Sequence, residues 1–166
     1  MQGSRLAASI AIILLLSLGA TSAFAKGLFG VQTHAIRVLE PPDVAGEYEG
    51  AIGDFGTPLY GASLTGRVLA PKDNGNGCER FEDEGYEAKW VDSDTPVIFL
   101  LSRGECFFVE KAYHAQRAGA AAVIVADTKP EPLITMTTPR DNPTVQELVP
   151  EIGIPTALVT KKLGDD

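Results

Sequence analysis

The chain has 166 residues, 45% of them hydrophobic, and its 22 acidic residues outnumber 14 Lys and Arg to give a formal net charge of −8. An acidic surface argues against a nucleic-acid ligand and against binding to anionic membranes, and it favours ligands that carry positive charge. A solvated acidic exterior explains the same charge without any ligand. The length fits one domain with a hydrophobic core.

Residues 1–25 have the pattern of a secretory signal peptide. Arg5 precedes the apolar stretch Leu6–Ala20, and Ala23-Phe24-Ala25 forms a small-x-small cleavage site. We therefore expect residues 26–166 to form the mature domain, in an oxidising compartment and with no further membrane span in this chain. A retained N-terminal anchor is the less favoured alternative.

Cys78 and Cys106 are the only two cysteines of the chain. A single pair in a secreted protein predicts one disulfide, which would stabilise the fold by roughly 3–4 kcal/mol on the chain-entropy model. A redox or zinc role has little support, because no CxxC motif is present and zinc would also need His34 and His114 as ligands. We expect no metal site and no cofactor.

Residues 95–127 predict a strand–helix–strand crossover. Val97–Leu101 and Ala122–Val125 are short apolar runs typical of buried strands, and Phe108–Ala118 has apolar residues at helical spacing. Gly119 lies where a C-terminal cap is expected. A crossover of this kind joins parallel strands, so we predict a mixed α/β fold.

Further strands are predicted at Ala35–Leu39, Gly66–Leu69, Ile152–Val159 and, as a short edge strand, Leu133–Met136. Pro155 indicates either the start of the last strand or an edge position for it. Residues 128–150 otherwise have the composition of a loop. The Gly-rich passage from Glu47 to Gly66 contains no phosphate-binding motif and predicts turns and close backbone approaches.

No catalytic signature is present in the sequence: it contains neither GxSxG nor HExxH, and neither histidine lies in a recognisable motif. We therefore expect a protein that is not an enzyme.

Arg103 is the strongest candidate for ligand binding, since it follows the C-terminal end of a buried strand, where α/β folds present their binding loops. Its guanidinium suits a carboxylate or the carbonyls of an extended peptide, and Gly104 permits close approach. Pairing of Arg103 with the acidic loop Glu79–Glu87 is an equally good alternative.

Three segments resemble the protease-associated (PA) domain: RGECFF at 103–108, AYHAQRAGAAAVIVAD at 112–127 and IPTALV at 154–159. GEYEGAIGDFGTPLYGASLTGRVLAPK at 46–72, KPEPLITMTTP at 129–139 and IPTALVTKKLGD at 154–165 are similar to the N-terminal PA domain of plant and algal vacuolar sorting receptors. This resemblance covers essentially all of residues 36–165. It implies a small mixed β-sheet or open barrel flanked by helices, with residues 26–166 as the PA domain.

The resemblance to sorting receptors implies a domain that binds without catalysing. It implies a place in the lumen of the secretory pathway (ER, Golgi and prevacuolar compartment), where the domain binds sorting signals of soluble proteins bound for the vacuole. The partners would be soluble vacuolar cargo proteins, held through extended sorting peptides, and a membrane would be met only through a segment outside this chain, in a single-pass type I protein. A regulatory or lid domain of a secreted or membrane protease is the alternative.

The cargo contacts that the resemblance implies lie in three places: the turn after the central strand, a mobile loop at Thr135–Asp141 and a short N-terminal segment. The residues are Arg103, Gly104, Glu105, Thr135, Met136, Thr137, Thr138, Pro139, Arg140, Asp141, Gln32, Thr33, His34 and Ala35.

The sequence departs from the receptors at several positions. Gly50 stands where they usually have a cysteine, and Thr137, Thr138 and Arg140 replace an acidic cluster. The sequence ends at Asp166, where a final helix is expected to begin. The replaced acidic cluster bears on the ligand preference. The end at Asp166 predicts a domain truncated at its C-terminal helix, either as a fragment of a receptor or as a soluble stand-alone PA protein.

Overall fold

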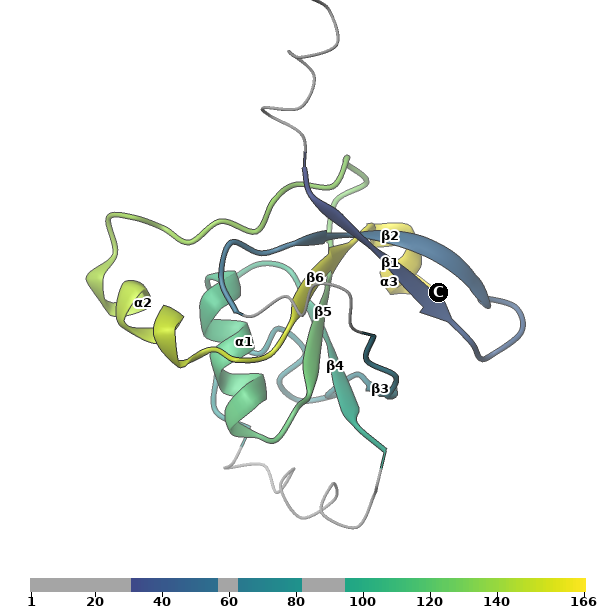
Figure 1. Cartoon of the computed structure of the whole chain (residues 1–166), viewed down its shortest axis with the longest axis horizontal. Coiled ribbons are helices and arrows are strands. Elements are labelled where there is room, and N and C mark those ends of the chain that lie inside the picture. The colour runs from purple at the N-terminus through teal and green to yellow at the C-terminus, as the bar shows by residue number, and fades with distance from the viewer. Residues whose placement is uncertain (1–30, 57–62, 82–94) are drawn as a thin grey trace, which may run out of the picture. The chain divides into compact units, whose positions relative to one another are not determined.

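The computed structural model describes residues 31–56, 63–81 and 95–166, which belong to one compact unit (Figure 1). The predicted signal peptide lies outside these described residues. The unit is built on a six-stranded mixed sheet with the strand order β1-β2-β6-β5-β4-β3. The strands are β1 (Thr33–Val38), β2 (Gly46–Ile52), β3 (Arg67–Leu69), β4 (Val97–Ser102), β5 (Ala122–Ala126) and β6 (Thr156–Val159). Strands β3 to β6 run parallel, while β1 and β2 form an antiparallel hairpin that adds to β6.

Helix α1 (Phe108–Arg117) connects the parallel strands β4 and β5, so the predicted crossover is confirmed. Its apolar stripe, which includes Val109, Ala112 and Ala115, is fully buried in one core cluster with Val123 and Val125 of β5. The helix ends as expected. Gly119 takes a left-handed φ of +88°, which glycine adopts without the steric cost of a side chain.

Helix α3 (Lys161–Asp165) packs on the opposite face of β5. Successive strand residues point to opposite faces, so Ala126 faces away from Val125 and the α1 side. A Cβ on Gly164 would lie only 2.3 Å from the Cβ of Ala126, and the absence of a side chain at Gly164 therefore permits this approach. The residues at which the sequence predicted only the start of a final helix thus form a short helix.

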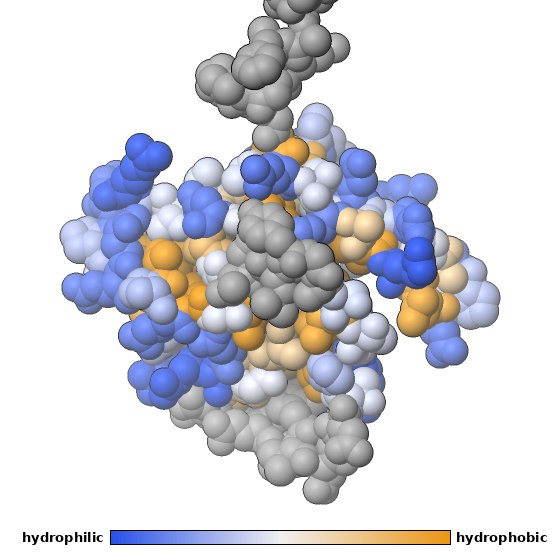
Figure 2. Space-filling model, viewed as in Figure 1, coloured by the Kyte–Doolittle hydropathy of each residue, from blue (hydrophilic) through white to orange (hydrophobic). Residues whose placement is uncertain are grey.

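The hydrophobic core lies between the sheet and α1. Phe81 and Phe99 are fully buried and meet edge to face, with ring centroids 5.0 Å apart. Figure 2 shows hydrophilic residues at the outer margin around α2 (Pro143–Leu148) and hydrophobic residues on its side toward the sheet, in agreement with the burial of Val145.

Two expectations from the sequence were wrong, and a third was incomplete. The Gly-rich passage has the expected close approaches, since a Cβ on Gly50 would lie 2.5 Å from Ile36 Cδ1, but it also contains strand β2, which was not expected. Leu133–Met136 forms no strand; only Met136 makes a single bridge, with Gly53. Residues 143–148, expected to be loop, form α2, which Asn142 caps by accepting a hydrogen bond from the Val145 N–H at 3.2 Å.

The last strand is shorter than expected. It begins at Thr156, directly after Pro155, and a short 3₁₀ helix, η3 (Val149–Glu151), precedes it. Strand β6 is paired on both sides, so the proline marks the start of the strand and not an edge. Within the described ranges, no helix is long and apolar enough to cross a bilayer.

Candidate functional site

A groove opens beside Arg103, between the turn that follows β4 and the segment after Met136. Its cavity volume is about 290 Å³, which is enough for a large side chain with its backbone. Among the described residues, the groove is lined by Arg103, Gly104, Cys106, Phe107, Phe108, Thr137 and Pro139. Four of these residues were predicted as contacts: Arg103 and Gly104 of the turn, and Thr137 and Pro139 of the loop. The two segments meet here although Gly104 and Thr137 are 33 positions apart in the chain (137 − 104 = 33).

The turn at the groove is held in an unusual backbone conformation. Gly104 and Glu105 both have positive φ, +118° and +65°, and the Cys106 N–H donates to the Gly104 carbonyl at 2.8 Å. The Arg103 N–H donates to the Ala126 carbonyl at 2.9 Å, which joins the turn to the end of β5. The disulfide between Cys78 and Cys106, confirmed in the structure, ties the other side of the turn to the preceding loop.

Arg103 is held by two carboxylates, neither of which belongs to the acidic loop considered from the sequence. Its Nη1 donates to Asp127 at 2.8 Å and to Glu131 at 2.6 Å. The Asp127 side chain is almost completely buried, at 1% exposure, whereas 26% of the Arg103 side chain is exposed. Burial by itself lowers the pKa of Arg103, but the hydrogen bonds and charges of Glu131 and Asp127 outweigh it and raise the pKa overall.

The guanidinium of Arg103 keeps donors for a ligand. Within residues 31–56, 63–81 and 95–166, Nε and Nη2 have no hydrogen-bond partner, and the guanidinium carbon lies 6.0 Å from the centroid of the Phe108 ring. Nη1 is already satisfied by its carboxylates. The remaining N–H groups are donors that suit the carbonyl oxygens of a ligand.

Lys111 stabilises the turn through hydrogen bonds. It lies on α1 and is completely buried, and its Nζ donates to the carbonyls of Asn76 at 2.5 Å and Gly104 at 2.7 Å. Nζ also lies 3.5 Å from Cys78 Sγ. Burial lowers the pKa of Lys111 to about 8, against the opposing charges of Glu105 and Glu110. Lys111 was not predicted from the sequence, because a lysine within a helix is usually exposed.

The lowered pKa of Lys111 predicts a specific dependence of stability on pH. Between pH 8 and the ordinary lysine value of 10.5, the unfolded chain binds more protons at this position than the folded one, so stability rises with pH. The free energy of unfolding should rise by about 2 kcal/mol between pH 8 and about pH 9.5 from this group alone. Lys111→Met removes this contribution, and urea titrations of both proteins at the two pH values measure it.

A matched control for Lys111 is Lys129→Met, because Lys129 is exposed. This variant should keep the pH dependence of the original protein. Equal pH dependence in Lys111→Met and Lys129→Met would contradict the assignment.

Phe107 forms an exposed apolar wall of the groove. Its side chain is 44% exposed, and it occupies the N-cap position of α1, where its backbone N–H donates to the Glu110 carboxylate at 2.9 Å. A large apolar side chain held in water at the mouth of a groove is the type of contact that a ligand buries. The two consecutive phenylalanines at a helix start could have indicated this, since both cannot face the core.

The opposite wall is anchored on Asp54. Its Oδ1 accepts from the backbone N–H of Thr138 at 2.8 Å and from the Thr138 hydroxyl at 2.7 Å. The Pro139 carbonyl accepts from Gln146 Nε2 at 2.7 Å. Thr137 and Pro139 of the predicted loop thus line the groove, Thr138 holds the segment in place, and Arg140 and Asp141 are exposed beyond it.

The other predicted contacts lie elsewhere. Met136 is completely buried in the core, Thr135 is half-buried beside it, and exposed Glu105 accepts from Asn76 Nδ2. Gln32, Thr33, His34 and Ala35 are exposed at the start of β1 and are not among the described residues that line the groove. Ile52 links residues 32–35 to the loop that begins at Thr135. Its backbone N–H donates to the Gln32 carbonyl, and its carbonyl accepts from the Met136 N–H.

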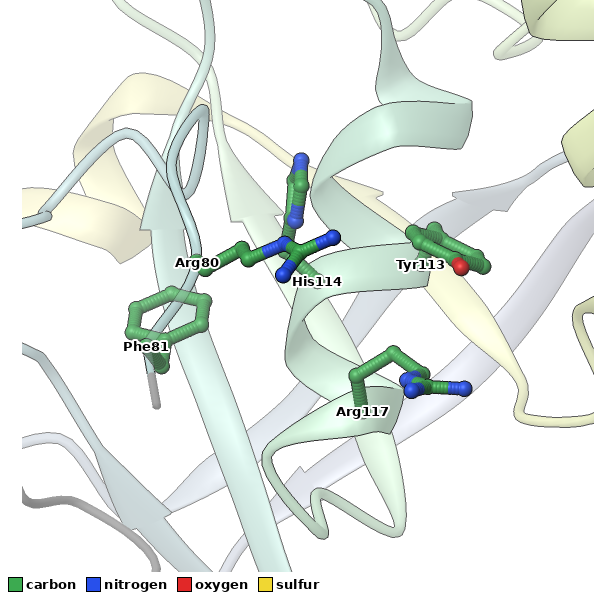
Figure 3. A pocket seen from close by; sticks show the side chains of 5 residues that line it. All are labelled: Arg80, Phe81, Tyr113, His114 and Arg117. Atoms are coloured by element: carbon green, nitrogen blue, oxygen red, sulfur yellow. The ribbon is translucent and has the colours of Figure 1, made fainter. Parts of the chain in front are cut away.

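A second depression lies against α1 (Figure 3). Tyr113, His114 and Arg117 project from the helix, and Arg80 and Phe81 complete the lining. Its volume of about 20 Å³ is enough for roughly one water molecule, so it has no room for a peptide side chain.

The sequence of this chain is similar to several receptors. It is 42% identical to vacuolar-sorting receptor 4 of Arabidopsis thaliana over 92% of this chain, and 43% identical to vacuolar-sorting receptor 1 of Pisum sativum over 82%. The chain spans about a quarter of the length of these curated relatives, 24% and 22% respectively.

The fold is similar to part of a zinc aminopeptidase from Bacillus subtilis. The TM-score is 0.52 at 22% sequence identity, over 82% of this chain and 28% of the enzyme. A likeness at this identity shows the fold alone. The family model of the PA domain matches residues 64–166, and β1 and β2, which lie before the matched residues, complete the same sheet. The chain belongs to the PA domain family.

Proposed function

We propose that this PA domain is a luminal cargo-recognition domain that binds extended sorting peptides of soluble proteins destined for the vacuole, and that it does so without catalysis. The observation that carries the proposal is the groove at Arg103. It combines guanidinium donors that have no partner among the described residues with an exposed phenylalanine, between two walls that hydrogen bonds and a disulfide hold apart.

The chemistry of the groove suits a peptide in an extended conformation. Such a peptide has carbonyl oxygens for Nε and Nη2 of Arg103 and a side chain that can pack on Phe107 and Pro139. The relatives named as vacuolar-sorting receptors support the same assignment. The likeness to an aminopeptidase extends only to the fold, which gives the protease-lid alternative less support.

The proposal also includes the cellular compartment in which the domain works. Residues 1–25 would direct the chain into the secretory pathway, and residues 26–166 would form the PA domain in the lumen of the ER, Golgi and prevacuolar compartment. A full-length protein of the receptor type would be held in the membrane by a single span outside this chain.

The test is direct binding of fluorescent peptides copied from the sorting segments of soluble vacuolar proteins, compared with scrambled versions. We expect saturable binding that Phe107→Ala weakens about tenfold, since one well-packed aromatic contact is worth about 1.4 kcal/mol or more. Phe107 is exposed and only its backbone takes part in the cap of α1, so the variant should fold normally.

Leu39→Ala is the matched control, because Leu39 is an exposed hydrophobic residue, 63% accessible, that follows β1 and does not line the groove. It should bind as the original protein does. Equal affinity of Phe107→Ala and Leu39→Ala would remove the groove from the proposal, and equal binding of true and scrambled peptides would remove the function.

A further inference from the structure

The positive charge of Arg103 is outweighed by the negative charges of the two carboxylates that bind it. Arg103 carries one positive charge, while Asp127 and Glu131, both hydrogen-bonded to its Nη1, carry two negative charges. The charges of four exposed residues nearby cancel: these are Glu105, Lys129, Arg140 and Asp141. The charges of Lys111, whose Nζ donates to the Gly104 carbonyl, and Glu110, whose carboxylate accepts from the Phe107 N–H, also cancel. The groove therefore has a net negative charge, in line with the net charge of −8 of the whole chain.

This arrangement is poorly suited to an anionic ligand. A ligand carboxylate at Arg103 would lie close to the carboxylates of Asp127 and Glu131, and like charges at such distances repel. Asp127 cannot move away, because its side chain is buried and its Oδ1 also accepts from the Lys129 N–H at 3.1 Å. Uncharged carbonyl oxygens avoid this repulsion.

Glu131 has one oxygen available for a ligand. Its side chain is 38% exposed, Oε1 accepts from Arg103, and Oε2 has no partner in the part of the chain that the structure describes. The hydrogen bond to Arg103 fixes the direction of the carboxylate and so reduces the entropy cost of binding. Glu131 adjoins the groove through this bond to Arg103, while Phe107 and Phe108 line the groove itself, and aromatic faces attract cations.

From these observations we infer that the groove selects peptides with a basic side chain, Lys or Arg, next to the residue that packs on Phe107, and that Glu131 is the residue that determines this preference. The ammonium or guanidinium group pairs with Oε2 of Glu131 while Arg103 donates to the peptide backbone. The inference rests on the proposed function, which it makes specific.

The experiment uses octapeptide pools, acetylated and amidated at their ends, in which one position at a time is fixed as Lys, Arg, norleucine or Glu. Each pool is titrated against the original protein, Glu131→Gln and Glu131→Lys. At one position, we expect the Lys and Arg pools to bind about tenfold more tightly than the Glu pool, with norleucine between them. Glu131→Gln should remove most of the preference for Lys over norleucine while leaving the norleucine pool within about twofold, and Glu131→Lys should reverse the preference toward Glu.

Glu147→Gln provides the matched control, because it makes the same change of charge at an exposed position on α2. It should retain the preference of the original protein. Binding that depends on Phe107 but shows no basic preference, or shows the same preference in Glu131→Gln, would overturn this inference and leave the proposed function intact. Failure of every pool to bind, or binding unaffected by Phe107→Ala, would overturn both.

Discussion

Replacing Arg103 by alanine is expected to lower the free energy of unfolding by about 3 kcal/mol, besides any effect on peptide binding. The reason is Asp127, whose buried carboxylate loses its cationic partner while remaining out of water. Removing one member of a buried pair costs more than the pair contributes, because the remaining charge is uncompensated. Urea unfolding at neutral pH measures the loss, which for a domain of this size corresponds to a fall of roughly 10 °C in Tm.

The double variant Arg103→Ala/Asp127→Asn tests the cause of this loss. Asparagine keeps an oxygen for the hydrogen bond from the Lys129 N–H but carries no charge, so most of the lost stability should return. Equal stabilities of the single and double variants would show that the unpaired carboxylate is not the cause. The double variant is also the proper protein in which to measure what Arg103 contributes to peptide binding, because it separates the loss of a ligand contact from partial unfolding.

The sequence predicted the parts of the fold that depend on local patterns. The crossover from Val97 to Ala126 has buried strands and an amphipathic helix that ends at a glycine, and each of these signals acts within a few residues. Strand β2 was missed because its glycines indicate turns, whereas in the structure Gly50 makes room for Ile36 of the neighbouring strand. Helix α2 was missed although Asn142-Pro143 is a good helix start, because its six residues carry little periodicity.

The candidate site was also predicted only in part, because some of its contacts join distant parts of the chain. Arg103 and the loop from Thr135 were proposed from position and resemblance, and the structure places Arg103, Gly104, Thr137 and Pro139 along one groove. The partners of Arg103 could not be read from the sequence, because many acidic residues compete for it and only the end of β5 brings Asp127 within 2.8 Å. Lys111 was missed for a related reason: its burial depends on a loop that is folded over it by a disulfide.

That disulfide carries the second large expected effect. Cys78 and Cys106 are 28 residues apart, and closing a loop of that length stabilises the folded chain by about 3–4 kcal/mol on the chain-entropy model. The double variant Cys78→Ala/Cys106→Ala should lose about this much stability in urea titrations. Reduced original protein should unfold at nearly the same urea concentration as the double variant, since both lack the constraint on the unfolded chain.

Loss of the bridge should also weaken binding in the groove, although neither sulfur has to touch the peptide. The turn from Gly104 to Cys106 has two positive φ values. Without the bridge, the described contacts that hold it are hydrogen bonds: from Lys111 to Gly104, from Asn76 to Glu105 and from the Arg103 N–H to the Ala126 carbonyl. A ligand would then have to order the turn when it binds, which lowers affinity. The measurement is peptide affinity in the double variant under conditions where at least nine-tenths of it is folded. Unchanged affinity there would mean that Lys111 and the backbone hydrogen bonds alone fix the groove, and that the disulfide acts only on the unfolded state.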